Sequence, residues 1–216
     1  MLKRLLPLLA LAALALAPQS LPSLHELVIT LNGRYNSIHT WEADFTQVYT
    51  AGLTTQTESG HLYLQKPGKM RWDYTEPVKK TFLVAGDTVW QYTAGDRVPT
   101  ESQVKNLNDL RSPLRFLLGH LDLDKELDQL SFSGMQPWQP GDRVIEGIPK
   151  APVEDAGWRK VWIEVSPAYE ITRLVILSLD GSQNDIRFSN IRVNRGLPHH
   201  IFTPPHPPSL SRTPKS

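Results

Sequence analysis

Apolar and polar residues alternate along much of the first half of this chain, a pattern typical of β-strands. Between residues 41 and 50 the larger side chains alternate with residues that are mostly charged or threonine; the larger set is Trp41, Ala43, Phe45, Gln47 and Tyr49. Because successive side chains of a strand point to opposite faces, this segment is predicted to be a strand with one apolar face. The same period predicts strands over residues 57–66, 70–74, 81–84 and 88–92, with turns at Pro67-Gly68 and Gly86-Asp87.

Two segments have the spacing of helices instead. Residues 24–38 carry apolar side chains at helical intervals, and Ser23 with Glu26 predicts a capping box at the start of this helix. Residues 108–118 lack β-branched residues and predict a short apolar helix that begins near Ser112-Pro113, because proline suits the first helical position.

Strand patterns resume after the second helix, over residues 130–132, 143–146, 159–166, 171–179 and 184–193. The last of these changes parity, since Ile186 and Phe188 share one face while Ile191 and Val193 share the other. This change predicts a β-bulge near Ser189-Asn190, which would bend the sheet. We therefore expect a mainly β protein with a few helices, built on a curved antiparallel sheet.

The two ends of the chain differ in composition from the rest. Residues 1–17 have the form of a secretory signal peptide, with Lys3 and Arg4 before a Leu/Ala-rich run that is too short to span a bilayer. The domain is then expected over residues 18–203. The proline-rich residues 204–216 are predicted to be an extended or disordered tail.

Composition argues against several kinds of chemistry. The chain has no cysteine, so it can form neither a disulfide scaffold nor a thiolate metal site. Without Lys3 and Arg4 the formal charge falls from +1 to about −1, which does not suit nucleic-acid binding. The histidines of the tail, His199, His200 and His206, have no acidic residue among them to complete a metal site. We expect no enzyme activity, no metal and no cofactor, although 22 acidic residues leave a hydrolase open.

Aromatic side chains dominate the apolar faces of the predicted strands. For any single ring, a place in an ordinary core is the simpler interpretation. Together, these aromatic side chains form a large apolar face that other elements must shield from water. A curved sheet under a small helical cover can leave an apolar interior that side chains do not fill.

A series of motifs, taken in order, resembles one family, the LolA carriers of outer-membrane lipoproteins in the periplasm of Gram-negative bacteria. The resemblance runs over most of the mature chain. The motifs are Phe45-Thr46-Gln47, Gly60-His61-Leu62-Tyr63-Leu64, the hairpin from Lys66 to Tyr74, Phe82-Leu83-Val84, Val89-Trp90-Gln91-Tyr92, Ser112-Pro113-Leu114-Arg115-Phe116-Leu117-Leu118-Gly119, Phe188-Ser189-Asn190 and Phe202-Thr203-Pro204-Pro205.

This resemblance implies an incomplete, strongly curved antiparallel β-barrel, covered by a helical lid around an apolar cavity. It implies a periplasmic carrier, expected to be a monomer, with acylated lipoproteins as cargo, an inner-membrane ABC-type release complex as donor and an outer-membrane lipoprotein acceptor. The residues that would line the acyl-chain cavity are Phe45, Leu64, Trp72, Phe82 and Trp90. Those that would plug it as a lid are Leu114, Phe116 and Leu117.

The same resemblance gives roles to the first hairpin. Pro67 and Met70 lie in the turn where a partner could dock. Lys66 stands where well-known members carry an arginine that is implicated in latching the lid and passing cargo forward. Because a lysine ammonium lacks the planar fork of an arginine, we expect a looser latch here.

Other functions remain open at this stage. A LolA-like carrier or sensor of another amphiphile, such as a glycolipid or free lipid, would use the same apolar interior. A LolA-like signalling domain would need a membrane partner. Polysaccharide binding would favour exposed aromatic platforms over rings that alternate with buried aliphatic side chains.

Overall fold

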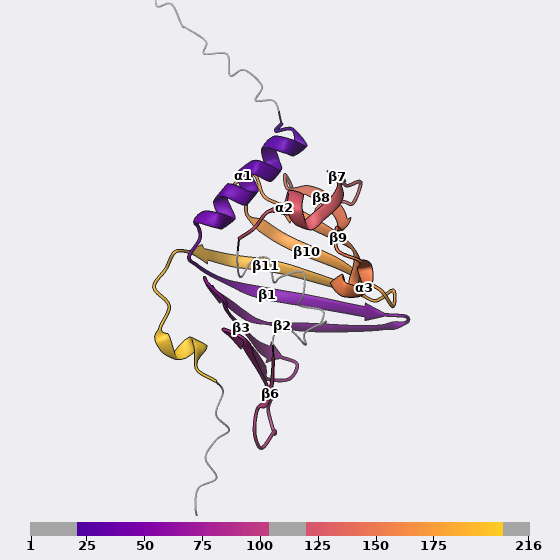
Figure 1. Cartoon of the computed structure of the whole chain (residues 1–216). Coiled ribbons are helices and arrows are strands. Elements are labelled where there is room, and N and C mark those ends of the chain that lie inside the picture. Colours follow the sequence, from indigo (N-terminus) through magenta and orange to yellow (C-terminus); the bar gives the residue numbers. More distant parts are fainter. Residues whose placement is uncertain (1–20, 104–119, 205–216) are drawn as a thin grey trace, which may run out of the picture.

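The computed structural model describes residues 21–103 and 120–204. The predicted signal peptide (1–17), the predicted helix at 108–118 and all but the first residue of the predicted tail (204–216) lie outside the described residues. Within the described ranges the protein is mainly β, with one longer helix and several short ones around a single sheet (Figure 1).

The described residues form one antiparallel sheet of 11 strands, made of two meanders. The N-terminal meander runs through β1 Thr40–Ala51, β2 Thr54–Gln65, β3 Lys69–Glu76, β4 Lys80–Ala85, β5 Thr88–Thr93 and β6 Thr100–Gln103. The C-terminal meander runs through β7 Leu127–Phe132, β8 Arg143–Pro149, β9 Trp158–Val165, β10 Ile171–Ser178 and β11 Gln183–Val193. Pairing of β1 with β11 joins them, so that β6 and β7 are the edges of an open, curled sheet.

Helix α1, Leu24–Ser37, begins as its sequence predicts. The side chain of Ser23 accepts a hydrogen bond from the backbone N–H of Glu26, and the Glu26 carboxylate accepts one from the backbone N–H of Ser23. These two bonds satisfy N–H groups that a helix start leaves without partners. The buried side of α1, formed by Leu27, Val28, Leu31 and Tyr35, packs on one face of the sheet.

We call this face the inner face and the opposite one the outer face. The hydrophobic core lies between the inner face and the helices α1 and α2, where α2 is the short helix Leu123–Glu126. The remaining helices are α3, Val153–Ala156, and the 3-10 helix η3, His199–Phe202. The sequence analysis predicted none of α2, α3, η3 and strand β6.

The predicted bulge in the last strand is confirmed. The register between β1 and β11 shifts between the pairs Glu42–Arg192 and Asp44–Ser189, and Asn190 has a φ of 52°. Asparagine tolerates this left-handed conformation better than most residues. The bulge therefore accounts for the change of parity between Phe188 and Ile191.

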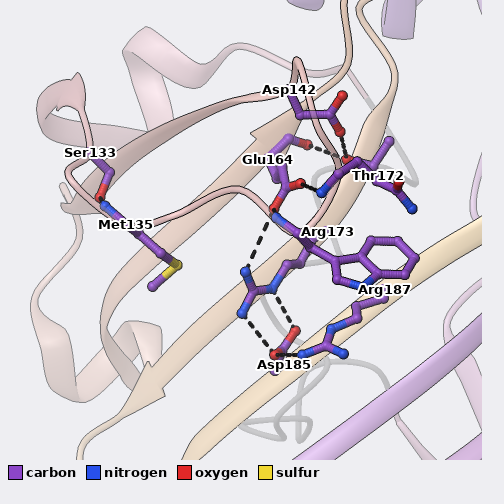
Figure 2. Close-up of polar contacts among 10 residues, drawn as sticks. Ser133, Met135, Asp142, Glu164, Thr172, Arg173, Asp185 and Arg187 are labelled. Atoms are coloured by element: carbon purple, nitrogen blue, oxygen red, sulfur yellow. Dashed lines mark hydrogen bonds and ion pairs between the residues drawn. The ribbon is translucent and has the colours of Figure 1, made fainter.

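A network of ion pairs and hydrogen bonds covers the outer face of the C-terminal meander (Figure 2). Arg173 on β10 donates two hydrogen bonds to the Asp185 carboxylate on β11, at 2.8 and 2.9 Å, and Arg187 donates a third at 2.8 Å. Glu164 on β9 is only 2% exposed and lies 3.6 Å from Arg173. Its two carboxylate oxygens accept hydrogen bonds from the backbone N–H groups of residues 138 and 139, which fasten the β7–β8 connection to the sheet.

The outer face of the N-terminal meander is covered differently. Helix η3 packs against β3 and β4, where the ammonium of Lys69 lies 5.8 Å from the centre of the Phe202 ring. The guanidinium of Arg71 donates a hydrogen bond to the backbone carbonyl of Ile201 at 2.7 Å. The end of the described chain is thus packed against the sheet, and His199 and His200 belong to η3.

Candidate functional site

Four of the five residues predicted to line a cavity come together on the inner face. Phe45, Leu64, Trp72 and Phe82 are all buried in one hydrophobic cluster. The ring centres of Phe45 and Trp72 lie 4.6 Å apart, and those of Phe45 and Tyr74 lie 5.0 Å apart, both in edge-to-face geometry. The alternation of the sequence therefore produces a continuous aromatic surface across β1, β3 and β4.

Gly60 makes this aromatic surface possible. It lies on β2 between Phe45 of β1 and Tyr74 of β3. A Cβ atom at this position would lie 1.9 Å from the backbone oxygen of Asp73. Only glycine fits so close to the neighbouring backbone, and its missing side chain lets the rings on either side meet above it.

Trp90 is a correction to the predicted lining. The register of β4 with β5 pairs Val84 with Val89 and Leu83 with Trp90. Val84 and Val89 belong to the inner core, so Trp90 and Leu83 point to the outer face. The resemblance and the parity assumed for residues 88–92 placed Trp90 in the lining, but a shift of one residue along a strand reverses the face.

The predicted docking turn needs a second correction. Met70 is 3% exposed and packs in the core with Trp72 and Tyr74, because the three share one parity of β3. It cannot contact a partner from that position. Pro67, by contrast, is exposed in the turn between β2 and β3.

Lys66 holds the C-terminal end of helix α1. Its ammonium donates a 2.7 Å hydrogen bond to the backbone carbonyl of Tyr35, which lies in the last turn of that helix. A cation at this end of a helix is favoured by the helix dipole. Burial lowers the pKa of Lys66 from its ordinary value.

Other contacts fix the same end of α1 from two sides. Toward β10, the Tyr35 hydroxyl accepts a hydrogen bond from the backbone N–H of Ile171 at 2.9 Å, and Arg34 pairs with Glu170 at 2.6 Å. Burial raises the pKa of the Tyr35 hydroxyl well above its ordinary value. Toward the segment before α2, the Asn36 side chain exchanges two hydrogen bonds with the backbone of Leu121. Polar contacts therefore hold the C-terminal end of a helix whose buried side is apolar.

The inner face becomes polar at the end of the sheet away from Lys66. A pocket of about 330 Å³ opens there, and its polar lining includes Gln47, Tyr49, Gln56, Glu58, Tyr74, Lys80 and Gln91. The Tyr74 hydroxyl donates to the Gln47 side chain at 3.0 Å, and Lys80 pairs with Glu58 at 2.6 Å. The ammonium of Lys80 also lies 4.2 Å from the centre of the Tyr74 ring. We call this the polar pocket; sequence reasoning missed it, although Gln47 stands in the apolar alternation of β1 and was the available signal.

The predicted lid residues Leu114, Phe116 and Leu117 lie outside the described residues. Within the described ranges, no group of three or more His, Asp or Glu side chains is placed to hold a metal ion. None of the helices in those ranges is long and apolar enough to cross a membrane.

Comparison with known proteins shows which family the chain matches. The family described as outer membrane lipoprotein carrier protein LolA matches residues 36–205. The chain belongs to the LolA family. An outer-membrane lipoprotein carrier protein of Methylococcus capsulatus is 30% identical over 172 residues, 77% of each chain. One of Chromobacterium violaceum is 30% identical over 209 residues, 94% of this chain and 95% of the relative.

Among solved structures, a LolA superfamily protein from Nitrosomonas europaea superposes with a TM-score of 0.48 and 12% sequence identity. The match covers 85% of this chain and 98% of the other. This structural similarity is too low to bear on the function of the protein.

Proposed function

We propose that this LolA family member is a non-catalytic periplasmic carrier. It shields the acyl chains of lipoproteins against its inner face and moves them from the inner to the outer membrane. The observation that carries the proposal is the aromatic inner face beneath a helix whose end is held by polar contacts. Membership of a family described as lipoprotein carriers, and relatives that bear that name, support it.

The physical need for such a carrier follows from the hydrophobic effect. Each CH₂ group moved from an apolar environment into water costs about 0.8 kcal/mol. At this value, exposing two or three long acyl chains to water would cost on the order of tens of kcal/mol. This cost prevents a free lipoprotein from crossing the periplasm.

Release requires that the carrier does not bind with all of that energy. In this structure Phe45, Trp72 and Phe82 already pack against one another and the core. Acyl chains would replace these existing contacts, so that only the difference between the two sets would appear as affinity. The proposed lid residues Leu114, Phe116 and Leu117 would take part in the same exchange.

Lys66 would act as the latch in this exchange. Its single hydrogen bond to the Tyr35 carbonyl ties the β2–β3 hairpin to α1. Pro67 is exposed beside it and offers a contact for the membrane partners, an ABC-type release complex and an outer-membrane acceptor. A partner that bound at this turn would be well placed to strain the Lys66–Tyr35 contact.

The experiment is to purify the exported protein from periplasm and identify what it carries. Organic extraction with mass spectrometry, and a gel for acylated protein, should find stoichiometric lipoprotein. Phospholipid or glycolipid in its place would keep the carrier fold and replace the cargo. A protein that is empty, and that takes no lipoprotein from inner-membrane vesicles supplied with a release complex and ATP, would contradict the proposal.

A further inference from the structure

Two uncharged polar side chains are buried on the inner face without hydrogen-bond partners in the described part of the chain. The indole Nε1 of Trp72 has none, although the residue is 0% exposed. Neither Nδ2 nor Oδ1 of Asn184 has one, although that residue is 1% exposed. Asn184 shares the parity of Ile186 and Phe188 on β11, which places it on the inner face.

Such groups are costly to a fold and uncommon in native structures. A buried donor or acceptor loses its hydrogen bonds to water and gains none in return. An apolar residue of similar size would avoid this loss at either position. The other described buried side-chain atoms without a partner are the Nε atoms of Arg34 and Arg187, whose guanidinium groups make ion pairs through another nitrogen. Trp72 and Asn184 have no such compensation, which points to a partner that arrives with a ligand.

Both residues lie beside the polar pocket. The ring of Trp72 stacks on that of Tyr74 with centres 6.3 Å apart, and Tyr74 lines the pocket. Asn184 is the cross-strand partner of Tyr49, which also lines it. The aromatic surface, the two unpartnered groups and the polar pocket therefore lie next to one another on the inner face. The surface that they form is apolar at one end and polar at the other.

The charge of the pocket restricts the chemistry of a ligand. Among the described residues that line it, the two charged ones, Glu58 and Lys80, neutralise each other in an ion pair. The other lining residues that the structure describes are uncharged and present amide, hydroxyl and aromatic groups. A pocket of this kind suits uncharged groups that both donate and accept hydrogen bonds, and its described side chains offer no free cation to a phosphate.

We propose that the polar pocket, with Trp72 and Asn184, binds the ester and amide linkages at the acylated N-terminus of a lipoprotein. This inference rests on the proposed function and names the part of the cargo that the site recognises. Trp72 has only a donor, which matches an ester carbonyl of a diacylglyceryl group. Asn184 has a donor and an acceptor, which match the N–H and C=O of an amide. The acyl chains extend from these linkages over the rings of Phe45 and Phe82.

The test compares probes with the same acyl chain and different polar ends. The purified protein, stripped of lipid, is titrated with an N-palmitoylated dipalmitoylglyceryl-cysteinyl peptide, with dipalmitoyl phosphatidylglycerol and with palmitate. The variants are Trp72→Phe and Asn184→Leu, each of which removes the polar group and keeps most of the volume. Trp162→Phe is the matched control, since that indole lies on the outer face and donates to Glu146 at 3.0 Å.

We expect each inner-face variant to weaken lipopeptide binding by about tenfold, the value of one hydrogen bond to a buried partner. Palmitate binding should not change in Asn184→Leu, and its melting temperature should not fall, because no bond is lost in the free protein. Trp72→Phe should weaken lipopeptide binding more than palmitate binding, because the indole ring also belongs to the apolar surface. Trp162→Phe should keep wild-type lipopeptide affinity.

Wild-type lipopeptide affinity in both inner-face variants would overturn the inference and leave the proposed function intact. Equal losses for lipopeptide and palmitate would also overturn it, because they would assign the two residues to the apolar surface alone. Tighter binding of phosphatidylglycerol than of lipopeptide would assign the pocket to a phosphate. If wild-type protein bound none of the probes, the proposed function itself would fail.

Discussion

The N-terminal strands present aromatic rings to the inner face, whereas the C-terminal strands present mostly aliphatic side chains. On β1, β3 and β4 the core contains Trp41, Phe45, Trp72, Tyr74 and Phe82. On β8 to β11 it consists of valine, isoleucine and leucine, apart from Trp158 and Phe188. The outer faces differ as well, because buried ion pairs tie β9, β10 and β11 together (Figure 2).

This difference indicates a division of roles between the two halves. Branched aliphatic side chains and interlocked charges fix the C-terminal half on both faces. The N-terminal half holds an unpartnered indole, a polar pocket and a cluster of aromatic rings. We infer that the inner face of the C-terminal half is rigid, and that the inner face of the N-terminal half rearranges when cargo binds.

The largest expected effect comes from the buried ion pairs of the C-terminal half. Glu164→Ala removes the carboxylate that holds the β7–β8 connection and leaves Arg173 without one of its two acidic neighbours. We expect the free energy of unfolding to fall by about 3–5 kcal/mol, measured by urea denaturation. The matched change in the N-terminal half is Glu58→Ala, whose more exposed pair with Lys80 should cost about 0.5 kcal/mol. Equal losses in the two variants would contradict the division.

A second prediction concerns the aromatic surface. Gly60→Ala forces a Cβ against the backbone of Asp73 and separates β2 from β3. We expect a loss of about 2 kcal/mol in the free energy of unfolding, together with weaker binding of an acylated probe. Gly33→Ala is the control, since a Cβ at Gly33 on helix α1 meets nothing within 4 Å. A Gly60→Ala protein with wild-type stability would show that this close approach is absent in solution.

The latch should have a smaller effect on stability than on binding. Lys66→Met removes the hydrogen bond to the Tyr35 carbonyl and the cation at the end of α1. The free energy of unfolding should fall by about 1 kcal/mol or less, while an acylated probe should bind faster because α1 separates more easily. Lys66→Arg should slow binding below the wild-type rate. Stopped-flow fluorescence distinguishes the three proteins, and identical rates would remove Lys66 from the mechanism.

The smallest expected effect is a change in pH dependence. Burial alone would raise the pKa of Asp185, but the hydrogen bonds and charges of Arg173 and Arg187 outweigh it and hold the pKa below its ordinary value of 3.8. Because the folded-state pKa is the lower one, Asp185 stabilises the fold above pH 3.8 and loses this contribution as the pH falls through the folded value.

The free energy of unfolding should therefore fall less steeply with acid in Asp185→Asn than in the wild type, as measured by urea denaturation at a series of pH values below 3.8. Asp44→Asn is the control in the N-terminal half, where the carboxylate is 41% exposed. A slope that changes as much in the control as in Asp185→Asn would show that burial of the pair adds nothing.

Local patterns predicted the elements and the inner face well. The capping box at Ser23, the strand alternation from Trp41 to Tyr74 and the bulge near Asn190 depend on neighbours in the sequence, and the structure has all three. The prediction for Trp90 was wrong because the parity assumed for residues 88–92 is opposite to the one that the register with β4 gives.

The rest depends on contacts between distant segments, which no local pattern reports. Lys66 bonds to a backbone carbonyl, and a carbonyl has no signature in the sequence. Glu164, Arg173 and Asp185 come from three strands and look like ordinary surface charges when read singly. Asn184 also reads as a surface residue, and only its burial without a partner reveals it.

The most direct test that cargo binds to the N-terminal inner face is photo-crosslinking in cells that export lipoproteins. Benzoylphenylalanine would replace Phe82 on the N-terminal inner face, Leu174 on the C-terminal inner face, or Tyr63 on the outer face. Our account predicts that adducts with acylated lipoprotein form most strongly from position 82, more weakly from 174 and not from 63. Adducts from position 63 that equal those from 82 would show that the inner face does not hold the cargo.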